Sequence, residues 1–276
     1  MSKRNPLCLA GLLFVLIAAA SELRPAANNF RDDQLRFERV RAAVQEKEAV
    51  LKSLFAQKAV PYPPRQIFIR AFKEEKVLEL WARGALDKPF TLIKAYDICS
   101  LSGGPGPKRR EGDFQVPEGF YVIDQFNPFS IFHLSLRINY PNASDRILSD
   151  PDVPGGEIFI HGNCVSIGCL PLTDDKIKEV YLVALEAKSG GQERIPVHIF
   201  PLRLSQTNMD GLKDRRIRGE FPAWPEAKAP GGKGADLIAF WENLKEGYEL
   251  FEQTKTVPQY SVEPRTGKYL FIRPSP

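Results

Sequence analysis

A short apolar strand that ends in His-Gly and is followed closely by Gly-Cys is the feature that most restricts the fold of this chain. Residues 158–160 are Ile-Phe-Ile, and His161-Gly162 follows them directly. Gly168-Cys169 comes next, so that Cys169 stands eight positions after His161. Glycine adopts backbone conformations closed to other residues, and two glycines allow the chain to turn back here. The sequence therefore predicts a strand, a tight loop and a return that brings His161 and Cys169 together.

This arrangement has three chemical interpretations. A thiol attacks a carbonyl as its thiolate, so a nucleophilic Cys169 needs a base such as His161 and backbone donors for the oxyanion. The second interpretation is a zinc site, because His161, Cys164 and Cys169 lie within nine residues and His198 would supply a fourth ligand. Structural zinc turns usually pair ligands as Cys-x-x-Cys, and this run lacks that spacing. The third is structural, a small buried cysteine near a hydrogen-bonded core histidine.

The first twenty residues are typical of a secretory signal peptide. Lys3 and Arg4 precede an apolar run, residues 7–20, that ends in three alanines. The run is too short for a comfortable membrane span, and an uncleaved N-terminal anchor is the alternative. Cys8 lies at the start of the apolar run instead of at its end, which argues against lipidation. Removal of residues 1–20 lowers the net charge from +4 to +2, a balance that offers no electrostatic case for binding nucleic acid.

Export would place the other three cysteines, Cys99, Cys164 and Cys169, in an oxidising compartment. An odd count leaves one thiol free or paired outside the chain. If Cys169 stays free for chemistry, a disulfide between Cys99 and Cys164 is conceivable. Two reduced, buried cysteines are the equal alternative.

Hydrophobic periodicity and helix breakers predict an α+β fold for the 276 residues. Residues 30–58 and 235–254 carry apolar stripes at helical spacing, and a third helix, residues 173–188, has Thr173 as its N-cap. The β-rich runs predict strands at residues 67–72, 76–82, 90–100, 120–124, 131–140, 157–161, 195–204 and 269–272. The Gly/Pro-rich residues 102–107 predict a loop. The expected architecture is a strand-rich core with amphipathic helices from both termini.

The segment around Cys169 resembles the active-site signature of the L,D-transpeptidases, the family with a YkuD-like catalytic domain. Their pattern is His-Gly, a spacer, then Ser/Thr-His-Gly-Cys, a hydrophobic residue and Arg or Asn. Here the spacer is much shorter, Ile167 stands at the second histidine and Pro171 at the Arg or Asn. The shortened form is similar to the YafK-like branch, which residues 109–121 and 133–142 also resemble.

The resemblance spans roughly residues 61–204 and implies a division of the chain. With the signal peptide expected at residues 1–20, the chain then divides into an N-terminal helical extension at 21–60, a catalytic domain at 61–206 and a C-terminal helical extension at 207–276.

The resemblance also implies roles for the residues of the motif. Cys169 would attack a peptide carbonyl, and His161 would take the thiol proton and later protonate the leaving amine. The backbone carbonyl of Gly162 would orient the histidine. The N–H groups of Gly168 and Cys169 would receive the oxyanion, because that turn leads toward a helix start. Ser166 would form the turn or support the site by a hydrogen bond.

Cationic and polar side chains near the predicted strand 131–140 are candidates for binding an anionic stem peptide. Strand alternation places His133 and Arg137 on one polar face, which is either a solvated surface or the wall of a cleft. Arg137 is the first candidate for a substrate carboxylate, and Arg146, after a predicted turn at residues 142–145, is a weaker one. The charge run at residues 108–110 is interpreted as solvated, with a position at the mouth of the cleft as the alternative.

The expected activity is that of a periplasmic cysteine L,D-transpeptidase. The enzyme would form an acyl-enzyme with the third stem residue, expel the terminal D-alanine and pass the acyl group to an amine. The close alternative is a hydrolase that cuts the same linkages, including those that tether proteins to the wall. The alternative from another functional class is a non-catalytic module that binds the wall. The expected partners are peptidoglycan stem peptides and, for the hydrolase, a wall-attached protein. No cofactor, metal or nucleic acid is expected, and the loop at residues 102–107 is expected to border the cleft.

Overall fold

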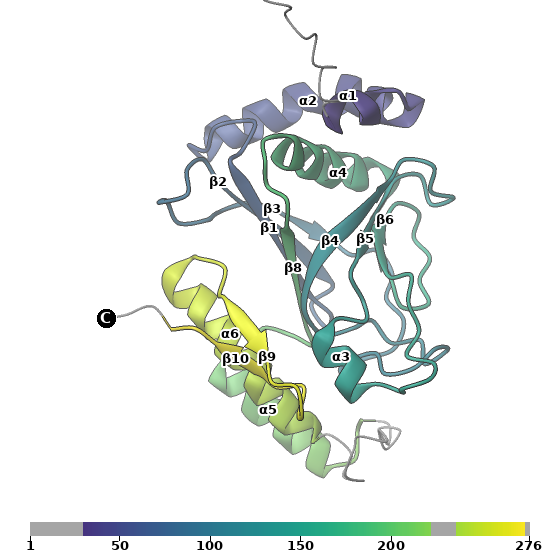
Figure 1. Cartoon of the computed structure of the whole chain (residues 1–276), viewed down its shortest axis with the longest axis vertical. Helices are drawn as coiled ribbons and strands as arrows, with labels where there is room; N and C mark the ends of the chain where they lie inside the picture. Colours follow the sequence, from purple (N-terminus) through teal and green to yellow (C-terminus); the bar gives the residue numbers. More distant parts are fainter. Residues whose placement is uncertain (1–29, 222–235, 274–276) are drawn as a thin grey trace, which may run out of the picture.

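The computed structural model describes residues 30–221 and 236–273 (Figure 1). The helices are α1 (Phe30–Leu35), α2 (Glu38–Gln57), α3 (Ala143–Leu148), α4 (Asp174–Ser189), α5 (Gln206–Ile217) and α6 (Leu237–Thr254). The strands are β1 (Gln66–Phe72), β2 (Val77–Arg83), β3 (Thr91–Asp97), β4 (Gly119–Asn127), β5 (Ser135–Ile138), β6 (Phe159–His161), β7 (Leu170–Pro171), β8 (Ile195–Phe200), β9 (Tyr260–Val262) and β10 (Tyr269–Phe271).

One curled sheet forms the centre of the molecule, with its strands in the order β3-β2-β1-β8-β4-β5-β6-β7. Neighbouring strands are antiparallel except in two pairs, β1 with β8 and β6 with β7, which run parallel. The pair β6–β7 ends the sheet at one edge. The mixed α+β class expected from the sequence is therefore correct, and the His-Gly and Gly-Cys motifs lie at that edge.

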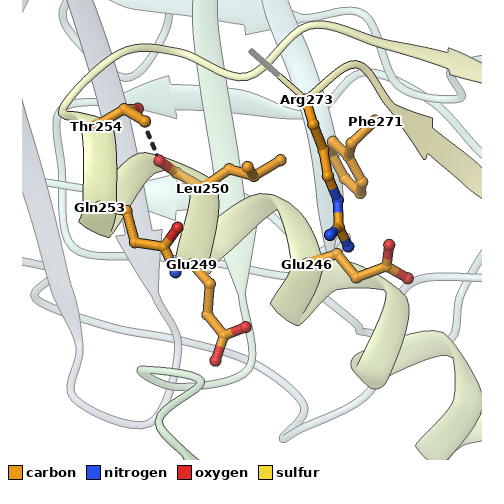
Figure 2. Close-up of a pocket in the computed structure, with 7 residues that line it drawn as sticks. All are labelled: Glu246, Glu249, Leu250, Gln253, Thr254, Phe271 and Arg273. Atoms are coloured by element: carbon orange, nitrogen blue, oxygen red, sulfur yellow. Dashed lines mark hydrogen bonds between the residues drawn. The ribbon is translucent and has the colours of Figure 1, made fainter. Parts of the chain in front are cut away.

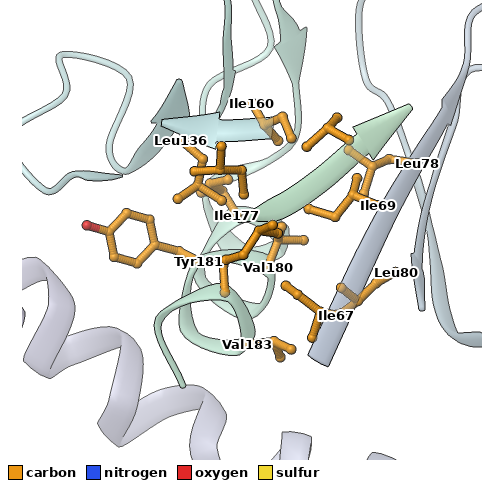
Figure 3. Close-up of a cluster of buried hydrophobic side chains, with 14 of the residues drawn as sticks. Ile67, Ile69, Leu78, Leu80, Leu136, Ile160, Ile177, Val180, Tyr181 and Val183 are labelled. Carbon is orange, nitrogen blue, oxygen red and sulfur yellow. The ribbon is translucent and has the colours of Figure 1, made fainter. Parts of the chain in front are cut away.

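Helix α4 packs on one face of the sheet, and α2 packs on the outside of α4 (Figure 1). The Thr173 hydroxyl caps α4 by accepting from the Lys176 N–H at 3.3 Å. The inward side of α4 meets apolar side chains of the sheet (Figure 3), and Ile69, Leu136 and Val180 are fully buried there. Each such side chain contributes about 1.5–3 kcal/mol by leaving water, so this layer fixes α4 against the sheet.

The C-terminal region covers the opposite face of the sheet. One phenylalanine from each of β1, β4 and β8 points to this face. These residues, Phe72, Phe120 and Phe200, share a buried cluster with Trp241 of α6 and Tyr269 of β10. A buried ion pair adds to this contact, because Arg70 of β1 binds Glu79 at 2.8 Å and Glu252 of α6 at 2.6 Å. The region predicted as a C-terminal extension thus shares a core with the central sheet, and it contains α5 and β9 besides the predicted helix and last strand.

The single N-terminal helix predicted at residues 30–58 is two helices, α1 and α2. The backbone of Phe37 is extended, with φ −90° and ψ 130°, and this breaks the helix. Arg41 donates from Nη1 to the carbonyls of Leu35 and Arg36 at 2.9 and 2.7 Å. These bonds satisfy the last carbonyls of α1, so the chain can bend without leaving them unpaired.

The strand predicted at residues 131–140 is wrong over its first half. Strand β5 begins at Ser135, and residues 128–133 form a turn. His133 has a left-handed φ of 73°, and the Phe132 N–H donates to Ser130 Oγ at 3.1 Å, which stabilises the turn locally. His133 and Arg137 therefore do not share a strand face.

Two other polar segments differ from the prediction, one because of a local helix cap and the other because of buried ion pairs. Residues 142–145, predicted as a turn, begin α3, where Asn142 and Asp145 form a reciprocal capping box. The run at residues 108–110 is only partly solvated. Lys108 and Arg109 are buried and pair with Asp113 at 2.8 Å and with Asp145 at 3.1 Å.

Among the helices within residues 30–221 and 236–273, none is long and apolar enough to cross a membrane. The predicted signal peptide at residues 1–20 lies outside the described residues.

Candidate active site

The register of β6 and β7 places His161 and Cys169 on the same side of the sheet edge. Ile160 pairs with Leu170 and His161 with Pro171 in this parallel pair, so Cys169 lies beside Phe159, two residues before His161. Alternate residues of a strand point to the same face. The sulfur is held by main-chain groups, because Cys169 Sγ accepts from the Phe159 N–H at 3.4 Å and donates to the Glu157 carbonyl at 3.7 Å.

His161 is buried and its ring is oriented by the next residue. Nδ1 lies 2.5 Å from the Gly162 carbonyl oxygen. Because a carbonyl can only accept, Nδ1 carries the hydrogen and Nε2 of the neutral ring is left as the basic nitrogen. The ring of Phe132 lies against the imidazole, with the two centroids 4.6 Å apart. The Gly162 carbonyl therefore stands where the sequence analysis placed the group that orients the base.

Burial keeps both groups neutral near neutral pH. Desolvation lowers the pKa of His161, and the Gly162 carbonyl only partly opposes this effect. Desolvation raises the pKa of the Cys169 thiol, while the Phe159 N–H and the charge of Lys108 partly counteract it. These shifts favour a neutral thiol and a neutral imidazole at rest, so the sulfur has to lose its proton before or during any attack.

The loop between the two strands needs glycine at both ends. A Cβ on Gly162 would lie 2.6 Å from Asp174 Oδ1 and 2.8 Å from the Phe132 carbonyl oxygen. Gly168 has a φ of 135°, and a Cβ there would lie 3.1 Å from the Gln115 carbonyl oxygen. Asp174 cannot withdraw freely, because its Oδ1 accepts from the Asn163 N–H at 2.8 Å.

Replacing Gly162 with alanine is expected to destabilise the fold by about 1–3 kcal/mol, the usual range for overpacking a buried position. The measurement is chemical denaturation followed by circular dichroism. Gly156 offers a matched control, because a Cβ there meets no atom within 4 Å. Equal stability of the Gly162→Ala and Gly156→Ala proteins would contradict the crowding argument.

A disulfide joins Cys99 to Cys164, with the Cα atoms 5.5 Å apart. It ties the loop that precedes Cys169 to the segment after β3, and it decides between the two alternatives that the sequence left open for this pair. Cys169 is the free thiol among the described residues. Cys164 is thereby engaged, and His198 lies in β8 between the rings of Phe68 and Phe120, so the four residues of the zinc interpretation are not brought together.

Ser166 closes the turn that leads to Cys169. Its Oγ donates to the Cys169 carbonyl at 2.8 Å and accepts from the Gly168 N–H at 3.2 Å. The Gly168 N–H, predicted as an oxyanion donor, is therefore already engaged in this structure. Ser102 of the Gly/Pro-rich loop lies 3.5 Å from Ser166 through the two hydroxyl oxygens, which places that loop against the turn.

A pocket of about 600 Å³ lies beside Glu157, whose carbonyl contacts the sulfur. Arg137 and Arg146 both line it, together with Asp124, Asn139, Tyr140, Pro141, Asn142, Ala143 and Gly156. Arg137 is ion-paired with Asp124 at 3.0 Å and with Glu157 at 3.1 Å. Arg146 is exposed. His133 does not line this pocket. It lies in the turn beside Gly162, and its Cβ is 3.1 Å from the position that a Cβ on Gly162 would occupy.

Another pocket, of about 340 Å³, lies between α6 and the end of β10 (Figure 2). Glu246, Phe271 and Arg273 are among its lining residues. None of them belongs to the segments that carry His161 and Cys169, so this pocket is separate from the candidate site.

Two residues near the site, Glu157 and Phe132, were not singled out from the sequence, and a third, Lys108, was assigned there to a charge run and given no role in the chemistry. Glu157 holds the sulfur through its carbonyl, and Phe132 lies against His161. Lys108 affects the thiol through its charge. Glu157 stands four residues before His161, but no local pattern marks the other two, because only folding brings them to the site.

Comparison with known proteins assigns the chain to a family. Residues 65–199 match the YkuD family, the L,D-transpeptidase catalytic domain. Proteins named provisionally as the L,D-transpeptidase YafK, from Escherichia coli K12 and O157:H7, are 36% identical over 210 residues, which are 75% of this chain and 74% of theirs. The chain therefore belongs to the L,D-transpeptidase family. YafK is also the branch that the shortened motif resembles.

Solved structures show more distant likenesses. The helical cell shape determining protein Pgp2 of Campylobacter jejuni is 18% identical, with a TM-score of 0.39 over 71% of this chain and 73% of that one. Bd1075 of Bdellovibrio bacteriovorus is 19% identical, with a TM-score of 0.37 over 74% and 79%. Overlaps of this size have no bearing on the site.

Proposed function

We propose that this chain is a cysteine L,D-transpeptidase that acts on peptidoglycan stem peptides through an acyl-enzyme on Cys169. The observation that carries the proposal is the pairing of β6 with β7, which places a free thiol and an oriented imidazole on one side of the sheet edge. Membership of the L,D-transpeptidase family supports the choice of stem peptides as the substrate.

In the proposed first step, Cys169 Sγ attacks the carbonyl carbon of the third stem residue and its proton passes to His161 Nε2. The tetrahedral intermediate collapses by breaking the peptide bond, and His161 gives the proton to the departing D-alanine amine. In the second step an acceptor amine attacks the thioester carbonyl carbon and gives a proton to His161. The C–S bond then breaks, leaving the new peptide bond, and His161 returns the proton to Cys169 Sγ. Because burial favours the neutral thiol and the neutral imidazole, the thiol proton has to pass to His161 in the course of the first step. The Cys169 N–H remains the proposed oxyanion donor, since the Gly168 N–H is bound to Ser166.

We place this activity in the periplasm. The Cys99–Cys164 disulfide supports that location, because disulfides persist in oxidising compartments and are rare in the cytosol. The signal peptide proposed at residues 1–20 would direct the export.

The test is incubation of the purified protein with tetrapeptide muropeptides, followed by mass spectrometry. We expect release of D-alanine, a covalent adduct on Cys169 and cross-linked dimers. Tripeptides without dimers would identify water as the acceptor and assign the hydrolase alternative, for which a wall-attached protein is the further substrate to test. A Cys169→Ser protein is the control. Absence of any product or adduct that depends on Cys169 would contradict the proposal.

Arg146 is the proposed ligand for a carboxylate of the acyl donor, because it lines the pocket beside Glu157 and is exposed. Arg137 already has two carboxylate partners, so we propose that it holds Glu157 in place instead.

Replacing Arg146 with alanine is expected to raise KM about tenfold or more, since a hydrogen bond to a charged group is worth about 1.5–3 kcal/mol. Stability should change by less than about 0.5 kcal/mol at this exposed position. Steady-state kinetics with muropeptides measure the effect, and Arg110→Ala is the control, because Arg110 is an exposed arginine outside the pocket lining. The same KM in both variants would exclude Arg146 as a substrate ligand.

A further inference from the structure

The turn at residues 128–133 contacts both His161 and Gly162. The ring of Phe132 lies against the imidazole, with the centroids 4.6 Å apart. The carbonyl oxygen of Phe132 lies 2.8 Å from where a Cβ on Gly162 would stand, so the turn also abuts the residue whose carbonyl orients Nδ1. Any shift of this turn would change both the packing and the hydrogen bond that set the direction of the imidazole.

Helix α2 supplies the side chain that holds the turn. Arg39 Nη1 donates to the Ser130 carbonyl at 2.6 Å and to the His133 carbonyl at 2.8 Å. One nitrogen thus joins both ends of the segment that contains Phe132, across more than 90 positions of sequence. Phe37, at the start of the same helix, adds an edge contact to Phe129, with the ring centroids 4.5 Å apart.

We propose that Arg39 is a positioning residue for the active site, which holds the 128–133 turn so that Phe132 and Gly162 keep the His161 imidazole directed at Cys169. This assigns a function to the N-terminal helical segment, and it rests on the proposed role of His161 as the base. Arg39 donates to the backbone of the turn and not to the thiol or the imidazole, so it acts through the turn.

Arg39 is not needed to attach α2 to the rest of the protein. Val40, Ala43, Leu51 and Phe55 of α2 are fully buried against the main core. Ion pairs also join α2 to α4, one of them between Glu46 and Lys178 at 2.5 Å. The side chain of Arg39 is exposed, and substitutions at exposed positions usually change stability by less than about 0.5 kcal/mol. Loss of the Arg39 bonds should therefore loosen the turn while α2 stays docked.

The first experiment compares Arg39→Ala with Arg41→Ala, in the full chain. Arg41 is an exposed arginine of the same helix that binds the carbonyls of Leu35 and Arg36 and does not contact the turn. For Arg39→Ala we expect kcat to fall about 10- to 100-fold with little change in KM, because small misplacements of a reacting group have effects of that size. Arg41→Ala should stay within about twofold of the wild type, and Arg39→Lys should recover most of the rate by donating to the same carbonyls.

A double-mutant cycle with His161→Ala separates positioning from a general structural effect. The readout is the rate of Cys169 alkylation by iodoacetamide, which does not depend on the identity of the natural substrate. We expect Arg39→Ala to slow alkylation in the wild-type background and to have no further effect when His161 is absent. Equal slowing in both backgrounds, or an unchanged rate in the wild-type background, would overturn the proposal. Failure of the proposed function would appear instead as a wild-type protein that alkylates normally and turns over no muropeptide.

Discussion

Replacing Cys169 with alanine is expected to abolish product formation, with a fall in rate of at least about 10³-fold. Removal of the nucleophile from a covalent mechanism leaves only binding and oxyanion stabilisation, and losses in comparable enzymes are larger still. The side chain is half-buried and small, and its sulfur forms hydrogen bonds with the main chain at Phe159 and Glu157. The fold should therefore survive the change.

Mass spectrometry of muropeptide products measures the loss, and circular dichroism with thermal unfolding checks the fold. Cys169→Ser is the matched control, because it keeps the size of the side chain and replaces the thiol with a weaker nucleophile. A Cys169→Ala protein that retains even a tenth of the wild-type rate would show that another residue carries the chemistry.

Replacing His161 with alanine should lower the rate by about 10²- to 10⁴-fold, the range for loss of a general acid–base group. The Cys169 thiol has a raised pKa, so without the imidazole very little of it ionises at neutral pH. The variant should also show slower alkylation of Cys169. A His161→Ala protein with wild-type kcat and alkylation rate would exclude the histidine as the base.

The wild type and the His161→Ala protein are expected to differ in the pH dependence of kcat/KM. Burial lowers the pKa of His161 from its ordinary value of 6.5, so the ring stays neutral and basic down to a pH below that value. In the wild type, kcat/KM should fall with decreasing pH only below the ordinary histidine range. In His161→Ala this acid limb should disappear, and the remaining rate should rise with pH through the raised pKa of the thiol, which lies above the ordinary 9.0.

Local patterns predict most of the regular elements because local forces form them. The apolar stripes of α4 and α6 and the Thr173 cap depend on neighbours within a few residues, and their positions follow from the sequence. Predictions fail where a distant partner overrides the local pattern. Residues 131–134 alternate like a strand, yet the bonds from Arg39 hold the backbone around them in a turn.

By itself, the sequence determined the class of the fold, the family and the residues of the motif, because short spacings such as that of His161 and Cys169 are readable along the chain. Only the tertiary structure decided what surrounds them. The Cys99–Cys164 disulfide spans 65 positions, the arginine that binds the 128–133 turn comes from a helix more than 90 positions away, and Arg137 has partners on two other segments. Such contacts depend on how the strands pair and the helices dock, and no local pattern of residues encodes that pairing.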